Sequence, residues 1–268
     1  MFRNFGLILL LGLPSSFEAE ELPEPPVEAF LNVLDEARQF YRSKKYLEAL
    51  VAFRIALAHQ PENASILLPV GVCAYRIKRY SLAIQSLRQG IEFTQEPELL
   101  RNLKVWLVRS LLEEGDRMEK NMRWEEAIAH WKEALEWNEE PRQAERLRHR
   151  IHQGHFAHGS YHFSLEHHLE AALAFADILL DQPEEELVKR IRRMGVNLFL
   201  NGARWCLENH MPEEARRLYD CIVQHYTGYP VAYEEAQQYL SGDTPDSTFR
   251  NLWDSATASD SIFEEEIE

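Results

Sequence analysis

Small and large apolar residues recur along the chain in one pattern, which appears five times between residues 46 and 222. Each copy has an alanine, a large apolar residue four places later and a small or apolar residue three places after that, as in YLEALVAFRIAL and WEEAIAHWKEAL. Steps of four and three place these residues on one face of an α-helix. The pattern therefore predicts helices over residues 46–57, 80–91, 124–135, 168–179 and 211–222.

A second helix is expected before each of these, because a small residue always stands twelve places before the alanine. These small residues are Ala37, Gly71, Gly115, Gly159 and Ala203. Small residues on facing helices let the two backbones approach closely, and the large residue fills the space beside them. Prolines at 61, 97, 141, 183 and 230 mark loops or first turns, since proline does not fit a helix interior. The chain is thus predicted to be a series of antiparallel helix pairs.

This pattern strongly resembles the tetratricopeptide repeat (TPR), a helix–turn–helix unit of 34 residues. Residues 30–63 match it best, with Ala37, Phe40, Tyr46, Ala49, Phe53, Ala56 and Pro61 in register. The resemblance covers roughly residues 30–240 and implies an all-α fold, a right-handed superhelical solenoid of about five repeats. Residues 230–240 have the pattern of a capping helix, which the last repeat needs to cover its apolar face.

The chain departs from the family in its period. Successive pattern alanines are 34, 44, 44 and 44 residues apart, so the later units are about ten residues longer than the family norm. The added stretches, such as EPELLRNLKVWL and PRQAERLRHRI, have helical periodicity and lack turn residues. We expect them to lengthen the first helix of each later unit.

The two ends of the chain differ from the repeats. Residues 1–19 have the layout of a secretory signal peptide, with Arg3 before an apolar run from Phe5 to Leu13, too short for the ~20 residues of a membrane span. Residues 20–29 are expected to be an acidic, proline-rich linker. Residues 241–268 are expected to be an acidic, disordered tail, although Phe249, Leu252 and Trp253 stand at helical spacing within it.

Charge and motifs exclude several functions. The net charge is -15, and it is concentrated in the two flanks, so a basic face for nucleic acid is not expected. No nucleophile elbow, dinucleotide-binding glycine motif or phosphate loop occurs, so we expect neither an enzyme nor a cofactor. Of the three cysteines, Cys206 and Cys221 could pair if their helices are neighbours in an oxidising compartment; otherwise all three are small buried residues.

The family resemblance places the first helix of each repeat along a concave groove. The residues that this register directs into a peptide-binding groove are Arg38, Tyr41, Arg42, Leu68, Tyr75, Arg76, Phe156 and Phe163. Tyrosine beside arginine suits an extended peptide with acidic or aromatic groups; alternatively these residues only pack or solvate the helices. The family's carboxylate clamp is absent, because Leu34, Arg38, Leu68 and Val72 stand at its positions.

Seven of the eleven histidines lie between His149 and His168. A helical wheel places His155, His158 and His162 on the apolar face with Leu147, Ile151 and Leu165, and directs His149, His152 and His167 elsewhere. We predict no complete metal site, although His158 and His162, with Glu166 one turn on, could form a partial one. A pH-sensitive packing face and plain packing are the other interpretations.

Together these features predict an exported, non-catalytic scaffold of the periplasm or cell envelope, without a transmembrane span. Its expected role is to bind a protein partner, such as an extended peptide or a subunit of an envelope complex, in the concave groove and to support assembly of that complex. The family resemblance implies this role. Two alternatives remain, a histidine-rich metal-binding or pH-responsive helical module and a cytoplasmic TPR co-chaperone.

Overall fold

A computed structural model describes residues 27–181 and 183–242. Over these residues it contains only helices and the turns that join them, twelve helices in all. The predicted signal peptide, residues 20–26 of the predicted linker and residues 243–268 of the predicted tail lie outside the described residues. The last linker residues, 27–29, differ from the prediction because they begin the first helix. None of the described helices is both long and apolar enough to cross a bilayer.

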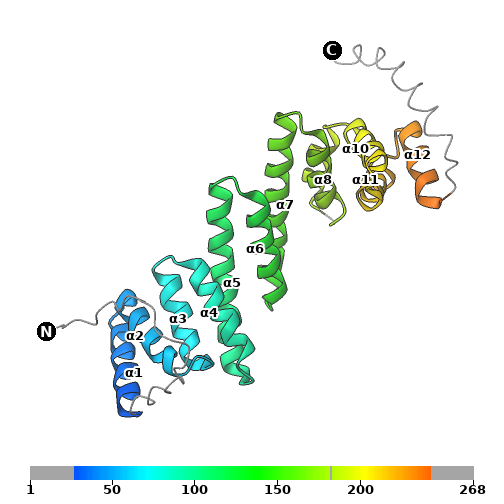
Figure 1. The fold of residues 1–268 in the computed structure, drawn as a ribbon. Helices are drawn as coiled ribbons and strands as arrows, with labels where there is room; N and C mark the ends of the chain where they lie inside the picture. The colour runs from blue at the N-terminus through cyan, green and yellow to red at the C-terminus, as the bar shows by residue number, and fades with distance from the viewer. Residues whose placement is uncertain (1–26, 182, 243–268) are drawn as a thin grey trace, which may run out of the picture.

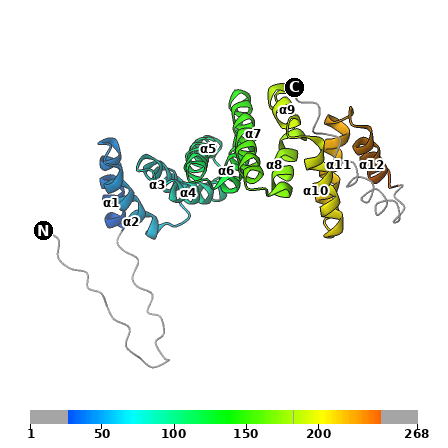
Figure 2. The ribbon, with the colours of Figure 1, turned by 90° about the horizontal axis from the view of Figure 1, so that it is seen from above.

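The helices form a solenoid of antiparallel pairs stacked one after another (Figures 1 and 2), which confirms the predicted fold class. Consecutive helices pack on each other from α1 to α8 and from α10 to α12. In addition α8 packs on α10 and α11, and α3 contacts α5. The pairs are α1 (Val27–Arg42) with α2 (Tyr46–His59), α3 (Ala64–Arg76) with α4 (Tyr80–Glu92), α5 (Pro97–Lys120) with α6 (Trp124–Trp137), α7 (Pro141–Ser164) with α8 (His168–Leu179), and α10 (Val196–Glu208) with α11 (Pro212–His225). The last helix, α12 (Pro230–Ser241), packs on α11 as the predicted cap.

The predicted contact between a small and a large residue is present in the second, third and fourth pairs. A Cβ added to Gly71 would lie 2.5 Å from a side-chain carbon of Leu87, and one added to Gly115 would lie 2.4 Å from Trp131 Nε1. Any larger residue would therefore push the two helices of the pair apart. The same relation joins Gly159 to Phe175, where the distance would be 2.7 Å.

The turn inside each pair has one conformation throughout the solenoid. Its central residue is left-handed although it is never glycine, with φ between 58° and 61°. These residues are Lys44, Lys78, Met122, Glu166 and His210. The next residue donates its backbone N–H to a carbonyl five residues earlier, as from Arg79 to Ala74 at 2.8 Å, which closes the end of the first helix. The left-handed residues repeat with the spacing of the pattern alanines, so the turns share the repeat register.

The added residues lengthen the first helix in the third and fourth repeats, where α5 and α7 each have 24 residues. The fifth repeat differs from this expectation. There the added residues form a separate short helix, α9 (Glu185–Arg192), and the chain turns at Gly195, where φ is 87°, before α10 begins. Leu187 and Ile191 of α9 are buried in the core of the last repeats, so the helix is part of the packing.

Candidate functional site

Three predicted groove residues of the first two repeats form an aromatic and arginine cluster with the middle of α5. We call it the aromatic–arginine cluster, and its members are Tyr41, Tyr46, Tyr75, Arg76, Trp106 and Arg109. The guanidinium of Arg76 lies 5.4 Å from the ring centre of Trp106 and 5.9 Å from that of Tyr46. Arg109 lies over the same Trp106 ring at 4.8 Å. Two arginines and the rings of several helices therefore form one continuous surface.

The tyrosines are fixed within this surface by ring contacts. Tyr75 meets Trp106 edge-on at 5.3 Å between ring centres, and Tyr41 meets Tyr46 at 6.0 Å. Burial raises the pKa of Tyr41 and Tyr75 above its ordinary value, so both hydroxyls stay protonated at neutral pH. The rings are partly buried, whereas Arg76 and Arg109 are exposed. The surface thus offers fixed aromatic edges and two guanidinium groups that a ligand can reach.

The other predicted groove residues lie outside the cluster or at its edge. Arg38 and Arg42 are exposed on α1, and Leu68 is partly buried against the core formed by α3 to α7. Phe156 is covered, because its ring packs against Phe175 at 5.7 Å and Arg190 of α9 lies over it at 4.0 Å. Phe163 is 37% exposed near the end of α7, beside His168.

Sequence reasoning missed three members of the cluster. Trp106 lies on α5 among the added residues and Arg109 just beyond them, and the groove prediction named no residue of the third repeat. Tyr46 begins α2 and had been counted only as a repeat position. A tryptophan and an arginine three residues apart lie on the same face of a helix, and this spacing could have indicated that Trp106 and Arg109 form one surface.

The structure differs from the helical-wheel prediction for this stretch at two residues, His152 and Leu165. His155 is buried as predicted, but His152 is equally buried, at 6% exposure, and its Nε2 lies 2.9 Å from Asp181 Oδ2. The prediction was wrong for His152 because α7 packs against both α6 and α8, which widens its buried arc beyond one face. It was also wrong for Leu165, which is 45% exposed because the helix ends at Ser164.

His158 and His162 come together but do not make a complete metal site. Their Nε2 atoms are 2.8 Å apart, and His162 Nδ1 lies 3.4 Å from Nδ1 of the exposed His167. Glu166 occupies the left-handed turn position, and among the described residues no three histidine, cysteine or acidic side chains converge to hold an ion. Burial also lowers the pKa of His158, which favours the neutral form of this side chain.

The cysteines do not pair in the structure. Cys73, Cys206 and Cys221 are free and buried, and burial raises the pKa of Cys73 and Cys221 to about 12. All three therefore act as small core residues rather than as a disulfide or a reactive thiol.

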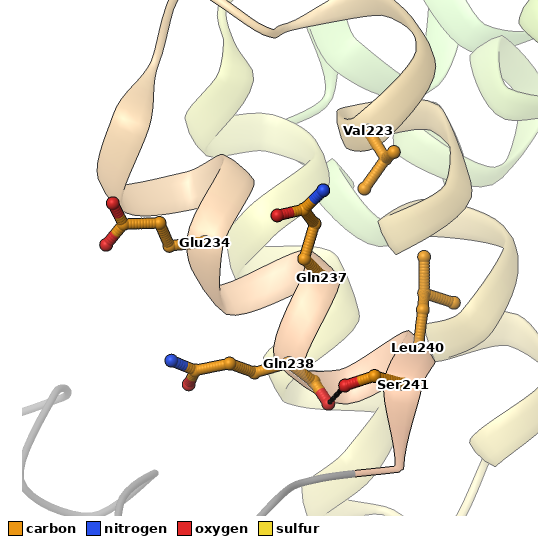
Figure 3. Close-up of a pocket in the computed structure, with 6 residues that line it drawn as sticks. All are labelled: Val223, Glu234, Gln237, Gln238, Leu240 and Ser241. Atoms are coloured by element: carbon orange, nitrogen blue, oxygen red, sulfur yellow. Dashed lines mark hydrogen bonds between the residues drawn. The ribbon is translucent and has the colours of Figure 1, made fainter.

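An open depression lies at the other end of the solenoid (Figure 3), away from the aromatic–arginine cluster. It is lined by Val223, Glu234, Gln237, Gln238, Leu240 and Ser241, and the Ser241 hydroxyl donates to the Gln238 carbonyl at 3.0 Å. Mostly amide and apolar groups line it, without a set of converging titratable groups suited to catalysis.

Comparison with known proteins connects part of the chain to the TPR family. The tetratricopeptide repeat family model matches residues 34–96, which are most of the first two repeats. No curated protein matches the chain in sequence. Proteins built from this repeat are generally non-catalytic and typically mediate protein–protein interactions.

Solved structures with a similar arrangement are distant in sequence. A thermophilic TPR protein of Thermus thermophilus is 16% identical over 79% of this chain and 98% of its own, with a TM-score of 0.35. YrrB, a TPR protein with an unusual peptide-binding site, is 13% identical over 79% of this chain and 94% of its own, with a TM-score of 0.32. The Rap conjugation gene regulator of plasmid pLS20, solved with the Phr* peptide, is 13% identical over 91% and 69%, with a TM-score of 0.32.

Proposed function

We propose that this protein is an exported, non-catalytic scaffold that binds a protein partner through the aromatic–arginine cluster. The partner would lie along the groove lined by the first helices and belong to a complex of the periplasm or cell envelope. The observation that carries the binding proposal is the pair of exposed arginines, Arg76 and Arg109, over the single Trp106 ring. The proposal of export depends on the layout of residues 1–19.

The chemistry of the cluster favours an extended segment with acidic and aromatic side chains. A carboxylate can accept hydrogen bonds from guanidinium groups that are already oriented by the ring, and an aromatic side chain can stack beside them. The protonated Tyr41 and Tyr75 hydroxyls can donate to backbone carbonyls of such a segment. Arginine and tyrosine are also among the residues that most often dominate binding energy at interfaces.

The binding proposal is tested by replacing the two arginines together, R76Q with R109Q. The matched control is R101Q with R216Q, which removes the same charge from exposed arginines on α5 and α11. Tagged proteins are used for affinity capture from a native envelope fraction, followed by quantitative mass spectrometry. We expect the wild type and the control to capture similar amounts of a partner. The amount captured by R76Q/R109Q should be at least ~10-fold lower, because arginines at an interface often contribute much of the binding energy. Equal capture by all three proteins would refute this binding surface.

Export is tested separately, by sequencing the N-terminus of the mature protein from its native cell. A chain that starts near Glu20 and is found in the envelope fraction supports the proposal. A chain that starts at Met1 in the cytoplasm would instead support the co-chaperone alternative.

A further inference from the structure

The outward face of α2 is apolar in a way that the equivalent face of α4 is not. Leu47, Val51 and Ile55 follow one another at steps of four residues and are 55%, 55% and 50% exposed. They form one ridge along the helix, since residues four apart lie on the same face. Exposed apolar residues that occur singly are ordinary, but a continuous ridge indicates a contact surface.

The other repeats show what normally stands at these positions. In α4 the same three register positions hold Ser81, Gln85 and Gln89, so the outward face there is polar. In α8 the first two positions hold Leu169 and Leu173, and there the chain covers them, because both pack against the core of the last repeats. An apolar face at this register is therefore covered in α8, while the ridge of α2 is open among the described residues.

The ridge is also bordered by positive charge in a strongly acidic protein. Residues 42–58 carry four basic residues against the single acid Glu48, a net charge of +3, while the chain as a whole has -15. The four are Arg42, Lys44, Lys45 and Arg54, all exposed, and among the described residues none of them forms an ion pair. The occupant of this face should therefore combine apolar side chains with acids.

We propose that the occupant is the acidic C-terminal segment, residues 243–268, of a second copy of this chain. This segment has eight acids and one arginine, and Phe249, Leu252 and Trp253 stand at helical spacing within it. Its apolar residues would lie on the ridge, and its acids would pair with the surrounding lysines and arginines. One contact then accounts for both the apolar ridge and the acidic segment, neither of which takes part in the proposed groove.

The contact is made between two chains because α2 and α12, the helix after which the segment begins, lie at opposite ends of the solenoid (Figure 1). The segment follows α12, whereas α2 belongs to the first pair (Figure 1). A head-to-tail contact of this kind leaves one free ridge and one free tail in every dimer, so it can extend to further copies. A symmetric α2–α2 contact is disfavoured, because it would bring two +3 faces together.

The small size of the ridge predicts weak, reversible association. Three half-exposed side chains offer far less than the roughly 800 Å² per partner that a stable dimer buries. The mean mass in solution should therefore rise with protein concentration and fall when salt screens the charges.

The test uses sedimentation equilibrium of the full chain and two variants. The ridge variant, L47S with V51Q and I55Q, installs the residues that α4 has at the same register, and circular dichroism checks that its helix content and melting are unchanged. The tail variant is F249A with W253A. Between about 5 and 200 µM we expect the mean mass of the wild type to rise at least ~1.5-fold, while each variant alone stays monomeric.

Mixing the two variants gives the decisive result. The ridge variant keeps an intact tail and the tail variant keeps an intact ridge, so the equimolar mixture should form dimers and nothing larger. A wild type that stays monomeric at every concentration would overturn the proposal, as would self-association that either variant retains. The wild type and the tail variant have the same intact ridge. If both bind phosphatidylglycerol vesicles and neither self-associates, the occupant of the ridge is an anionic membrane and the proposal is overturned.

Discussion

The two halves of the solenoid use one repeat frame to bury different kinds of side chain. In α1–α6 the buried residues are apolar apart from Ser86, Ser110 and Glu114, and helix pairs meet through contacts such as Gly115 with Trp131. In α7–α12 the buried residues include two histidines and the Arg204–Glu235 ion pair. The helix pairs and turns are the same in both halves, so backbone architecture alone does not decide what is buried. The repeat frame therefore accommodates buried polar groups where a neighbouring helix supplies a partner.

Two ion pairs show how large this difference should be. Glu235 of α12 is 3% exposed and accepts from Arg204 Nε at 2.9 Å and from the Tyr219 hydroxyl at 2.9 Å, while Arg204 is 8% exposed. Glu114 of α5 is similarly buried and accepts from Arg117 at 2.6 Å. The side chain of Arg117, however, is 52% exposed, so water can solvate it if the carboxylate is lost.

The largest effect is therefore expected from E235A. Removing a carboxylate from a buried ion pair typically costs about 3–5 kcal/mol, because the guanidinium stays in a low-dielectric site. E114A in the first half should cost only ~1–2 kcal/mol, since its partner can turn to water. Urea unfolding measures both free energies, and hydrogen exchange of α12 locates the loss. Equal costs for the two variants would show that the halves do not differ in this respect.

The second prediction concerns pH and His155. Burial, followed by the nearby charges of Lys132, His152, His158 and Arg217, lowers the pKa of His155 to about 3. The carboxylate of Asp177, 3.3 Å from His155 Nδ1, opposes this, but it is also paired with Arg217. In the unfolded chain the pKa is about 6.5, so below that pH the unfolded state binds more protons than the folded state.

Acidification should therefore destabilise the second half. Lowering the pH from 7.5 to 5 should reduce the free energy of unfolding by ~2 kcal/mol through His155, and the reduction continues as the pH falls toward 3. In H155L the free energies of unfolding at pH 7.5 and pH 5 should differ by about that amount less than in the wild type, because leucine does not titrate. Urea unfolding at both pH values measures the effect, and hydrogen exchange should show opening in α7 and α8 before α1–α4. A wild type that becomes more stable at pH 5 would mean that Asp177 outweighs burial.

Much of the fold could be predicted because its determinants are local and repeated. The sixteen-residue step from Gly71 to Leu87 recurs from Gly115 to Trp131, so five copies of one pattern support each other. The same regularity misled where the chain departs from it. The fifth repeat was expected to have a long first helix, yet Gly195 separates α9 from α10, and a glycine within a helical pattern is a known turn signal.

The candidate site was predictable only in part, because it depends on which helices meet. Tyr41, Tyr75 and Arg76 were identified from the register, but Trp106 lies among the residues added to α5 and Arg109 lies just beyond them. His152 was misplaced for a similar reason, since a helical wheel contains one helix and not Asp181 of the next. The groove residues other than the three cluster members stay a prediction, and Phe156 is covered by Arg190.

The smallest effect tests the frame that both halves share. Met122 and His210 occupy the left-handed turn position at φ 60° in the third and fifth repeats, and Met122 is 56% exposed. Glycine adopts this conformation without strain, but it also increases the conformational entropy of the unfolded chain. The relief of strain should exceed this entropic cost, so M122G and H210G should each stabilise the protein by about 0.5–1 kcal/mol. M122A and H210A are the controls, because alanine removes the side chain and keeps the strain. Urea unfolding should show similar gains in the two halves. A gain confined to one half would mean that the turns, and not only the buried groups, differ in energy between the halves.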